Sequence, residues 1–94
     1  MSSSKLRLVW DSWNREHIRK HNVSVSEANQ AFDNRVDISK SYLGRKVVLG
    51  MTKKGRLVTL VLSFEKQKDA YPVSARDMSS KERKMYYEKA KANE

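Results

Sequence analysis

The sequence predicts a single α+β domain, in which a first strand is followed by two helices, an antiparallel sheet and a C-terminal helix. Three observations predict it. Apolar residues alternate with polar ones near the N-terminus, the S-x-x-E spacing of a helix start occurs twice, and two β-rich runs are joined by a short turn that contains glycine. A chain of 94 residues has the size of one domain, residues 1–94, and can bury a modest core.

The N-terminal part contains a strand and a helix. In "KLRLVW", residues 5–10, every second residue is apolar, which predicts a strand with one buried face. Asp11 suits a helix N-cap because its carboxylate can accept from the free amides of the first turn. The helix is expected to run to about His21, since Asn22 tolerates the left-handed conformation that is common just past a helix end.

A second, brief helix is expected to follow, because Ser24 and Glu27 have the capping-box spacing. Its apolar stripe consists of Ala28, Ala31 and Phe32. The next segment, residues 33–44, is polar and poorly periodic. It is interpreted as a loop with a short strand near residues 36–38.

The β-rich runs are residues 45–52 and 56–64, and they form a hairpin in which Gly55 can take a positive φ. The second run is apolar on both faces, so we expect it to be the central strand. Residues 65–69 make a charged turn, and residues 70–76 return as a third strand. In that strand Pro72 lacks an amide donor, which indicates an edge or a bulge.

The C-terminal segment repeats the capping-box spacing at Ser79 and Glu82, which predicts a helix through about Lys91. The capping box alone explains the position of Glu82 with no role in catalysis. Arg83 and Tyr86 lie three residues apart and are therefore neighbours on the helix surface. Tyr87 points about 100° away from Tyr86, so at most one of these two rings faces a common site.

The charge of the chain points to an anionic partner. Lys and Arg number 20 against 11 Asp and Glu, which gives a net charge of +9. Residues 42–94 hold 13 of the basic and 6 of the acidic residues. This asymmetry favours a nucleic acid or a strongly acidic protein as partner, because phosphate neutralisation releases counterions and a positive field steers encounter. The alternative is a basic surface that has no such partner.

Several classes of protein are disfavoured. The chain contains no cysteine, which excludes a disulfide framework, a thiolate metal site and a cysteine nucleophile. No apolar run approaches the roughly 20 residues that span a bilayer, and the N-terminus lacks the hydrophobic block of a signal peptide. We therefore expect a cytoplasmic protein that does not bind membranes.

Histidine offers half of a metal-site spacing. His17 and His21 lie four residues apart on the first predicted helix, but "HIRKH" lacks the glutamate of H-E-x-x-H, and the chain has no third histidine. No metal or cofactor is expected. The alternative is that these rings pack with their polar tips outward. Histidine is also the side-chain type that titrates nearest to neutral pH, so either residue is a candidate for general acid-base chemistry.

Arginines from separate segments are candidates for binding phosphate. Alternation along residues 71–76 places Tyr71, Val73 and Ala75 on one face of the strand and Ser74 and Arg76 on the other. Arg56, at the start of the central strand, is expected near the same surface. Guanidinium groups bind phosphate through two parallel hydrogen bonds, and aromatic rings stack on unpaired bases. The alternative is that each arginine only solvates the end of a strand.

Residues 10–32, 49–64 and 73–87 together resemble the BrnT family of toxins from type II toxin-antitoxin systems, within the broader RelE-like group. The landmarks that carry the resemblance span most of the chain in the family's order: Trp10-Asp11, Lys20-His21, Glu27-Ala28, Gly55-Arg56, Ser74-Ala75-Arg76, and Glu82-Arg83 with Tyr86. Asn22 departs from the pattern, because the family commonly has glycine there. The first helix also follows a shorter spacing, and its register determines whether Lys20 or His17 reaches a site.

The resemblance implies a RelE-like fold and a metal-independent endoribonuclease that cleaves messenger RNA, inhibiting translation and growth. It implies attack by the ribose 2′-hydroxyl, a 2′,3′-cyclic phosphate product, a cognate BrnA-like antitoxin, and contact with DNA only through the antitoxin complex. Carried over position by position, the catalytic residues are Lys20, His21, Arg56, Arg76, Glu82, Arg83 and Tyr86. Two alternatives stay open: a non-catalytic module that binds RNA or the ribosome, and a protein-interaction domain for an acidic partner.

Overall fold

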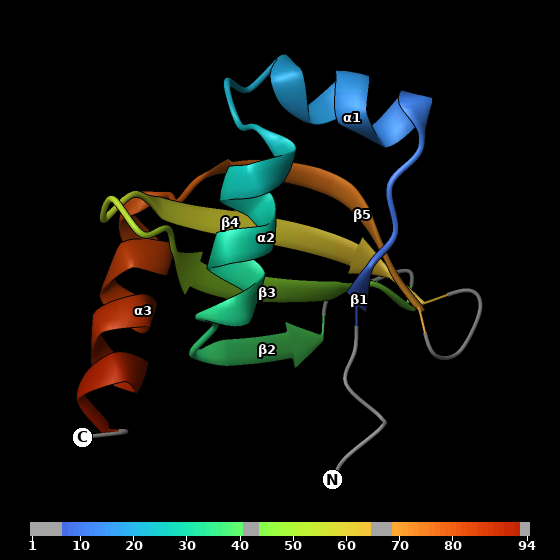
Figure 1. The fold of residues 1–94 in the computed structure, drawn as a ribbon. Helices are drawn as coiled ribbons and strands as arrows, with labels where there is room; N and C mark the ends of the chain where they lie inside the picture. The colour runs from blue at the N-terminus through green and yellow to red at the C-terminus, as the bar shows by residue number, and fades with distance from the viewer. Residues whose placement is uncertain (1–6, 41–43, 65–68, 93–94) are drawn as a thin grey trace, which may run out of the picture.

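The structure is a computed structural model that describes residues 7–40, 44–64 and 69–92 (Figure 1). The elements follow the order β1 (Arg7–Leu8), α1 (Ser12–Arg19), α2 (Val25–Asp33), β2 (Asp37–Lys40), β3 (Lys46–Met51), β4 (Leu57–Ser63), β5 (Asp69–Asp77) and α3 (Ser80–Ala92). The α+β class is confirmed. Most of the predicted charged turn lies outside the described residues.

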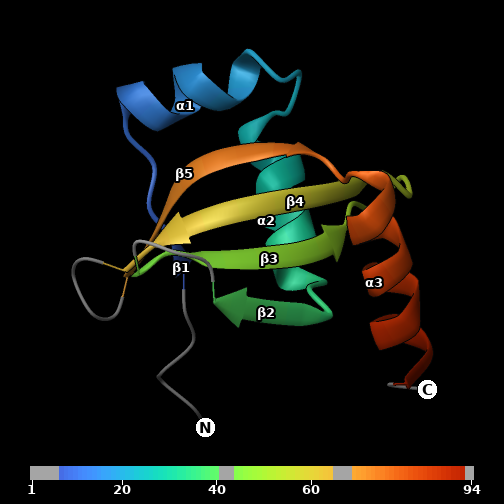
Figure 2. The same ribbon diagram turned by 180° about the vertical axis from the view of Figure 1, so that it is seen from behind.

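Five strands form one sheet with the order β1-β5-β4-β3-β2. Helices α1 and α2 lie on one side of the sheet, and α3 lies at one end of the opposite face (Figures 1 and 2). The main core fills the first side, where Ile18, Phe32, Val58, Leu60 and Leu62 are buried. A smaller apolar cluster lies under α3. The expectation that β4 is the central strand is confirmed, because it is the third strand of the five.

The sheet is mixed, which corrects the expected antiparallel sheet. Strand β1 pairs in parallel with β5, with Arg7 opposite Asp69 and Leu8 opposite Ala70, whereas the other three pairings are antiparallel. The physical reason is that β1 and β5 are brought together by tertiary folding across the two helices and the meander. Alternation of apolar residues predicts a strand but contains no information about the direction of its partner.

Strand β5 carries a bulge, which confirms the prediction made from Pro72. Val61 pairs with Ser74 and Leu62 pairs with Pro72, so Val73 is an extra residue on β5. The extra residue corrects the expected alternation, because Pro72 now shares a face with Ala75 and Tyr71 does not. Arg76 is opposite Thr59, on the face that α3 partly covers, as the alternation predicted for this residue.

The caps of the first two helices are those the sequence predicts. The amide of Asn14 donates to Asp11 at 2.9 Å, and the amide of Glu27 donates to Ser24 at 3.0 Å. In both helices the third residue also accepts a hydrogen bond from the amide of the N-cap residue. Asn22 has a φ of 60°, so it takes the expected left-handed conformation after α1.

Helix α2 packs directly on the backbone of β3 at Gly50. A Cβ atom at this glycine would lie 1.9 Å from the carbonyl oxygen of Ala31. Only a residue without a side chain permits this approach, which brings α2 close to the sheet. Among the described residues, no helix is both long enough and apolar enough to cross a lipid bilayer.

Candidate functional site

Charged side chains gather at one end of the sheet, where β4 begins, β5 ends and α3 begins. The turn between α1 and α2 lies at the same end (Figure 1). We refer to Arg56, Arg76, Asp77, Glu82 and Arg83 as the arginine–carboxylate cluster. It contains four of the seven residues that the resemblance assigns to catalysis.

A bidentate ion pair joins β5 to α3. Arg76 donates from Nη1 to Glu82 Oε1 at 2.7 Å and from Nη2 to Glu82 Oε2 at 2.9 Å. The Glu82 side chain is 18% exposed and that of Arg76 is 39% exposed. Parallel hydrogen bonds of this kind fix the orientation of the guanidinium plane as well as its position.

Glu82 accepts further hydrogen bonds within the cluster. The hydroxyl of Thr59 donates to it at 2.9 Å and the amide of Ser79 at 2.8 Å, while the amide of Glu82 donates to the Ser79 hydroxyl at 3.2 Å. Arg76 is the main cause that lowers the pKa of Glu82 to about 2. Glu82 is therefore both the predicted helix cap and an ionised anchor for Arg76, and a carboxylate of this pKa is a weak base.

Arg56 ties the turn after α1 to the end of β5. Its Nε donates to Asp77 Oδ1 at 2.8 Å, and its Nη1 donates to the carbonyl of Asn22 at 2.7 Å and to Glu27 Oε1 at 3.1 Å. Its Nη2 reaches the carbonyl of His21 at 3.5 Å. The hydrogen bond with Asp77 is the main cause that raises the pKa of Arg56. Arg56 thus holds in place the backbone that carries Lys20 and His21.

Asp77 is the residue on which three arginines converge. Besides its bond with Arg56, its backbone carbonyl accepts from Arg76 at 3.3 Å. The bond from Arg56 is the first cause that lowers the pKa of Asp77, and the charge of Arg83 lowers it as well. Arg83 is exposed, and within the described part of the chain its side chain makes no hydrogen bond or ion pair. Guanidinium groups from the residue before β4, from β5 and from α3 therefore lie at the same end of the sheet. Arg56 and Arg76 were expected near one surface, but Arg56 binds Glu27 of α2, whereas Arg76 is on the face that α3 partly covers.

The other three candidate residues lie in different settings. Tyr86 is 7% exposed and packs with Leu49, Leu57 and Met78, and burial raises its pKa. Its neighbour Tyr87 is the exposed tyrosine of the pair, at 57%. Lys20 and His21 are exposed residues at the C-terminal end of α1. The backbone carbonyl of His21 accepts a hydrogen bond from Arg56 of the cluster. The ring of Tyr86 packs in the apolar cluster under α3 instead.

Three partners in this network were not predicted as site residues. Asp77 and Glu27 bind an arginine that is distant in the sequence, and no local pattern signals such a pairing. Thr59 did leave a signal in the sequence, because it is a polar residue inside the apolar run of the central strand. In the structure it is fully buried. A buried hydroxyl needs a hydrogen-bond partner, and here that partner is Glu82.

The described residues contain no group of three or more His, Cys, Asp or Glu side chains arranged to hold a metal ion. The cluster instead offers fixed guanidinium groups. Such groups can stabilise negative charge on a phosphate without reorganising.

The fold and the cluster define a class of protein: a small, basic α+β domain with arginines held at one end of its sheet, where a polyanion can bind. The particular family follows from the sequence model of the family described as "Ribonuclease toxin, BrnT, of type II toxin-antitoxin system", which matches residues 10–82. The chain belongs to this family. Arg83 and Tyr86 lie beyond the matched segment. A comparison with curated proteins finds no match.

Proposed function

We propose that this protein is the toxin component of a type II toxin-antitoxin system and cleaves messenger RNA in the cytoplasm without a metal ion. A BrnA-like antitoxin would neutralise it, and DNA would be contacted only through the complex of the two. Membership of a family of ribonuclease toxins supports the proposal. The structural observation that carries it is the convergence of Arg56, Arg76 and Arg83 around Asp77.

The chemistry that fits is attack by the ribose 2′-hydroxyl on the adjacent phosphorus. The bond from the 2′ oxygen to phosphorus forms while the bond to the 5′ oxygen breaks, giving a 2′,3′-cyclic phosphate and a 5′-hydroxyl. Negative charge grows on the phosphoryl oxygens, so fixed cations lower the barrier. Arg83 is exposed, and Arg76 keeps 39% of its side chain exposed, so both can reach such a phosphate.

Two of the candidate residues are poorly suited to moving protons. Glu82, with a pKa of about 2, is ionised at neutral pH and too weak a base to accept the 2′ proton efficiently. Tyr86 is buried in an apolar cluster. We therefore assign the proton transfers to Lys20 and His21. Glu82 holds Arg76 in position, and Arg56 holds the α1–α2 turn in position.

The decisive experiment incubates purified protein with single-stranded RNA in excess chelator and analyses the ends of the products. We expect cleavage to 2′,3′-cyclic ends by the wild-type protein. Arg83→Gln should lose most of this activity and melt normally, because Arg83 is exposed and unpaired among the described residues. Lys89→Gln, a change of the same charge at an exposed position of α3, is the control and should cleave as the wild type does.

The same experiment discriminates the alternatives. Binding of RNA that stays intact both with and without chelator would favour a non-catalytic RNA-binding or ribosome-binding module. Salt-sensitive binding to an acidic protein, with no binding to RNA, would favour a protein-interaction domain. Cleavage that disappears in chelator would refute metal independence.

A further inference from the structure

Three rings lie along one face of α1 and the turn that follows it. Trp13, His17 and His21 are spaced four residues apart, which places them on the same side of a helix. Trp13 is 56% exposed. The other tryptophan, Trp10, packs against the main core and donates its indole N–H to Asn29 at 3.2 Å. The core therefore explains Trp10 and leaves Trp13 unexplained.

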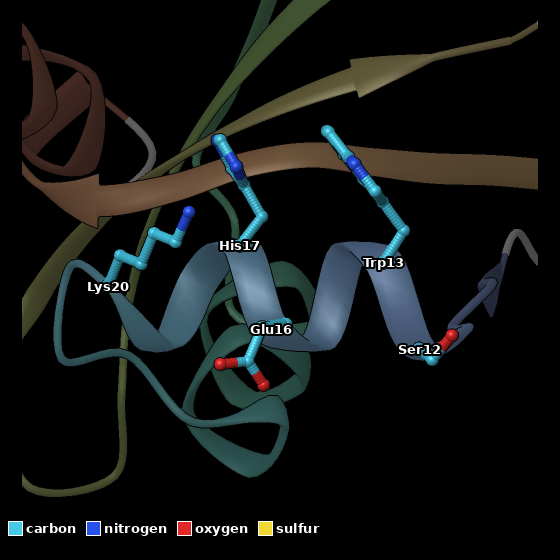
Figure 3. Close-up of a pocket in the computed structure, with 5 residues that line it drawn as sticks. All are labelled: Ser12, Trp13, Glu16, His17 and Lys20. Carbon is cyan, nitrogen blue, oxygen red and sulfur yellow. The ribbon is translucent and has the colours of Figure 1, made fainter.

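The rings of Trp13 and His17 form an ordered stack. Their centroids are 4.8 Å apart, and the angle between the ring planes is 9°. The rings of His17 and His21 form an edge-type contact, with centroids 6.1 Å apart and an interplanar angle of 68°. Figure 3 shows both stacked rings leaving α1 on the same side, with the Lys20 side chain extending along that side and Glu16 directed away. One face of Trp13 is thus held by His17, which restricts the rotamers of the indole.

An open groove runs beside this stack. It has a volume of about 350 Å³ and is lined by Ser12, Trp13, Glu16, His17 and Lys20. Its two charged lining residues are Glu16 and Lys20, and the Glu16 carboxylate is paired with Arg19 at 3.3 Å. The flat π surface therefore lies beside the ammonium group of Lys20.

We propose that the Trp13–His17 face of α1 is a base-stacking site for an unpaired nucleotide of single-stranded RNA. Stacking on an indole is available to every base, because each has a π face, and it is blocked when the base is paired within a duplex. The charge on α1 complements a phosphodiester backbone. The proposal concerns how the proposed ribonuclease holds its RNA substrate, so it rests on that proposed function.

The position of the stack relative to the arginine–carboxylate cluster supports this assignment. From Trp13 to the C-cap residue Lys20 the helix advances about 10 Å at 1.5 Å per residue, and His21 follows in the turn. At the far end of this span, the carbonyls of His21 and Asn22 accept hydrogen bonds from Arg56. An RNA strand that stacks on Trp13 and follows the helix axis is therefore led toward the cluster, where we place the scissile phosphate.

The test measures binding separately from cleavage. The probe is a fluorescently labelled, unstructured RNA of about 12 nucleotides, within the footprint of single-strand binding proteins, with 2′-O-methyl groups at every position so that the 2′ nucleophile is absent. Its Kd is measured by anisotropy in excess chelator for the wild type, Trp13→Ala, Trp13→Phe and Tyr87→Ala. Tyr87 is a matched control because it is 57% exposed and lies on α3.

We expect Trp13→Ala to weaken binding by about tenfold or more, from a stacking contribution of about 1–3 kcal/mol per base. Trp13→Phe should recover part of this loss, and Tyr87→Ala should leave Kd within about twofold. A single abasic position in the probe, placed in turn along the strand, should weaken binding to the wild type at one or two positions. The same abasic position should have little effect on the Kd of Trp13→Ala. The matching duplex should bind less tightly and be insensitive to the tryptophan.

The outcomes separate this inference from the proposed function. Cleavage by the wild type, with an unchanged Kd for Trp13→Ala, would refute the stacking site and leave the ribonuclease standing. A Trp13-dependent Kd without cleavage of ordinary RNA would refute the ribonuclease and leave the stacking site standing. If Trp13→Ala retains RNA affinity but loses affinity for the cognate antitoxin, the face is a protein interface and the inference is wrong. Thermal melts show whether each variant is folded.

Discussion

The ion pair between Arg76 and Glu82 gives a quantitative test of how the cluster is held. Glu82→Gln keeps the size of the side chain and one oxygen that can still accept from the Thr59 hydroxyl and the Ser79 amide. It removes the negative charge and one of the two hydrogen bonds to Arg76. The substitution therefore isolates the ionic part of the interaction.

The expected loss of stability follows from the pKa shift. The pKa of Glu82 falls from 4.5 to about 2, mainly because Arg76 hydrogen-bonds to it. At 1.36 kcal/mol per unit this shift corresponds to about 3 kcal/mol at neutral pH. Since Arg76 is 39% exposed, water screens part of the interaction, and we expect about 2 kcal/mol.

The pH dependence has a definite sign. A carboxylate whose folded pKa is lowered contributes its full stability above the unfolded pKa and loses it as the pH falls toward the folded pKa. The difference in unfolding free energy between the wild type and Glu82→Gln should therefore be full above about pH 5.5 and less than half of that at about pH 3.

Urea denaturation followed by circular dichroism at several pH values measures this difference. Glu88→Gln, at an exposed position on the same helix, is the control and should stay within about 0.5 kcal/mol of the wild type at each pH. A loss for Glu82→Gln that is independent of pH, or no larger than that of the control, would show that the ion pair does not set the stability of this end of the sheet.

Three further predictions concern other contacts. Gly50→Ala should destabilise the fold by at least 2 kcal/mol in a thermal melt, because its methyl group would meet the Ala31 carbonyl; an unchanged melting temperature would contradict the close packing of α2 on β3. Ser79→Ala should cost about 1 kcal/mol through loss of the helix cap, and an unaltered unfolding free energy would show that its 3.2 Å bond contributes nothing. Arg56→Lys should increase hydrogen exchange at the amides of residues 21–23, because an ammonium group cannot reproduce the forked contacts; protection equal to that of the wild type would refute its role in holding the turn.

Local patterns in the sequence were sufficient for the helices and the hairpin. The capping boxes at Ser24 and Ser79 mark the starts of α2 and α3, because a cap depends on residues only three positions apart. The left-handed turn at Asn22 and the positive φ of 89° at Gly55 are likewise set by the chemistry of a single residue. The apolar character of both faces of β4 predicted its central place in the sheet.

Contacts between distant segments were decided only by the tertiary structure. The parallel pairing of β1 with β5, the bonds from Arg56 to Asn22, Glu27 and Asp77, and the burial of Tyr86 all depend on chain segments that meet after folding. The sequence alone determined which side chains can carry positive charge and bind an anion. Whether a given arginine is exposed or already bound to a carboxylate depends on long-range packing, and a sequence pattern of short range contains no information about it.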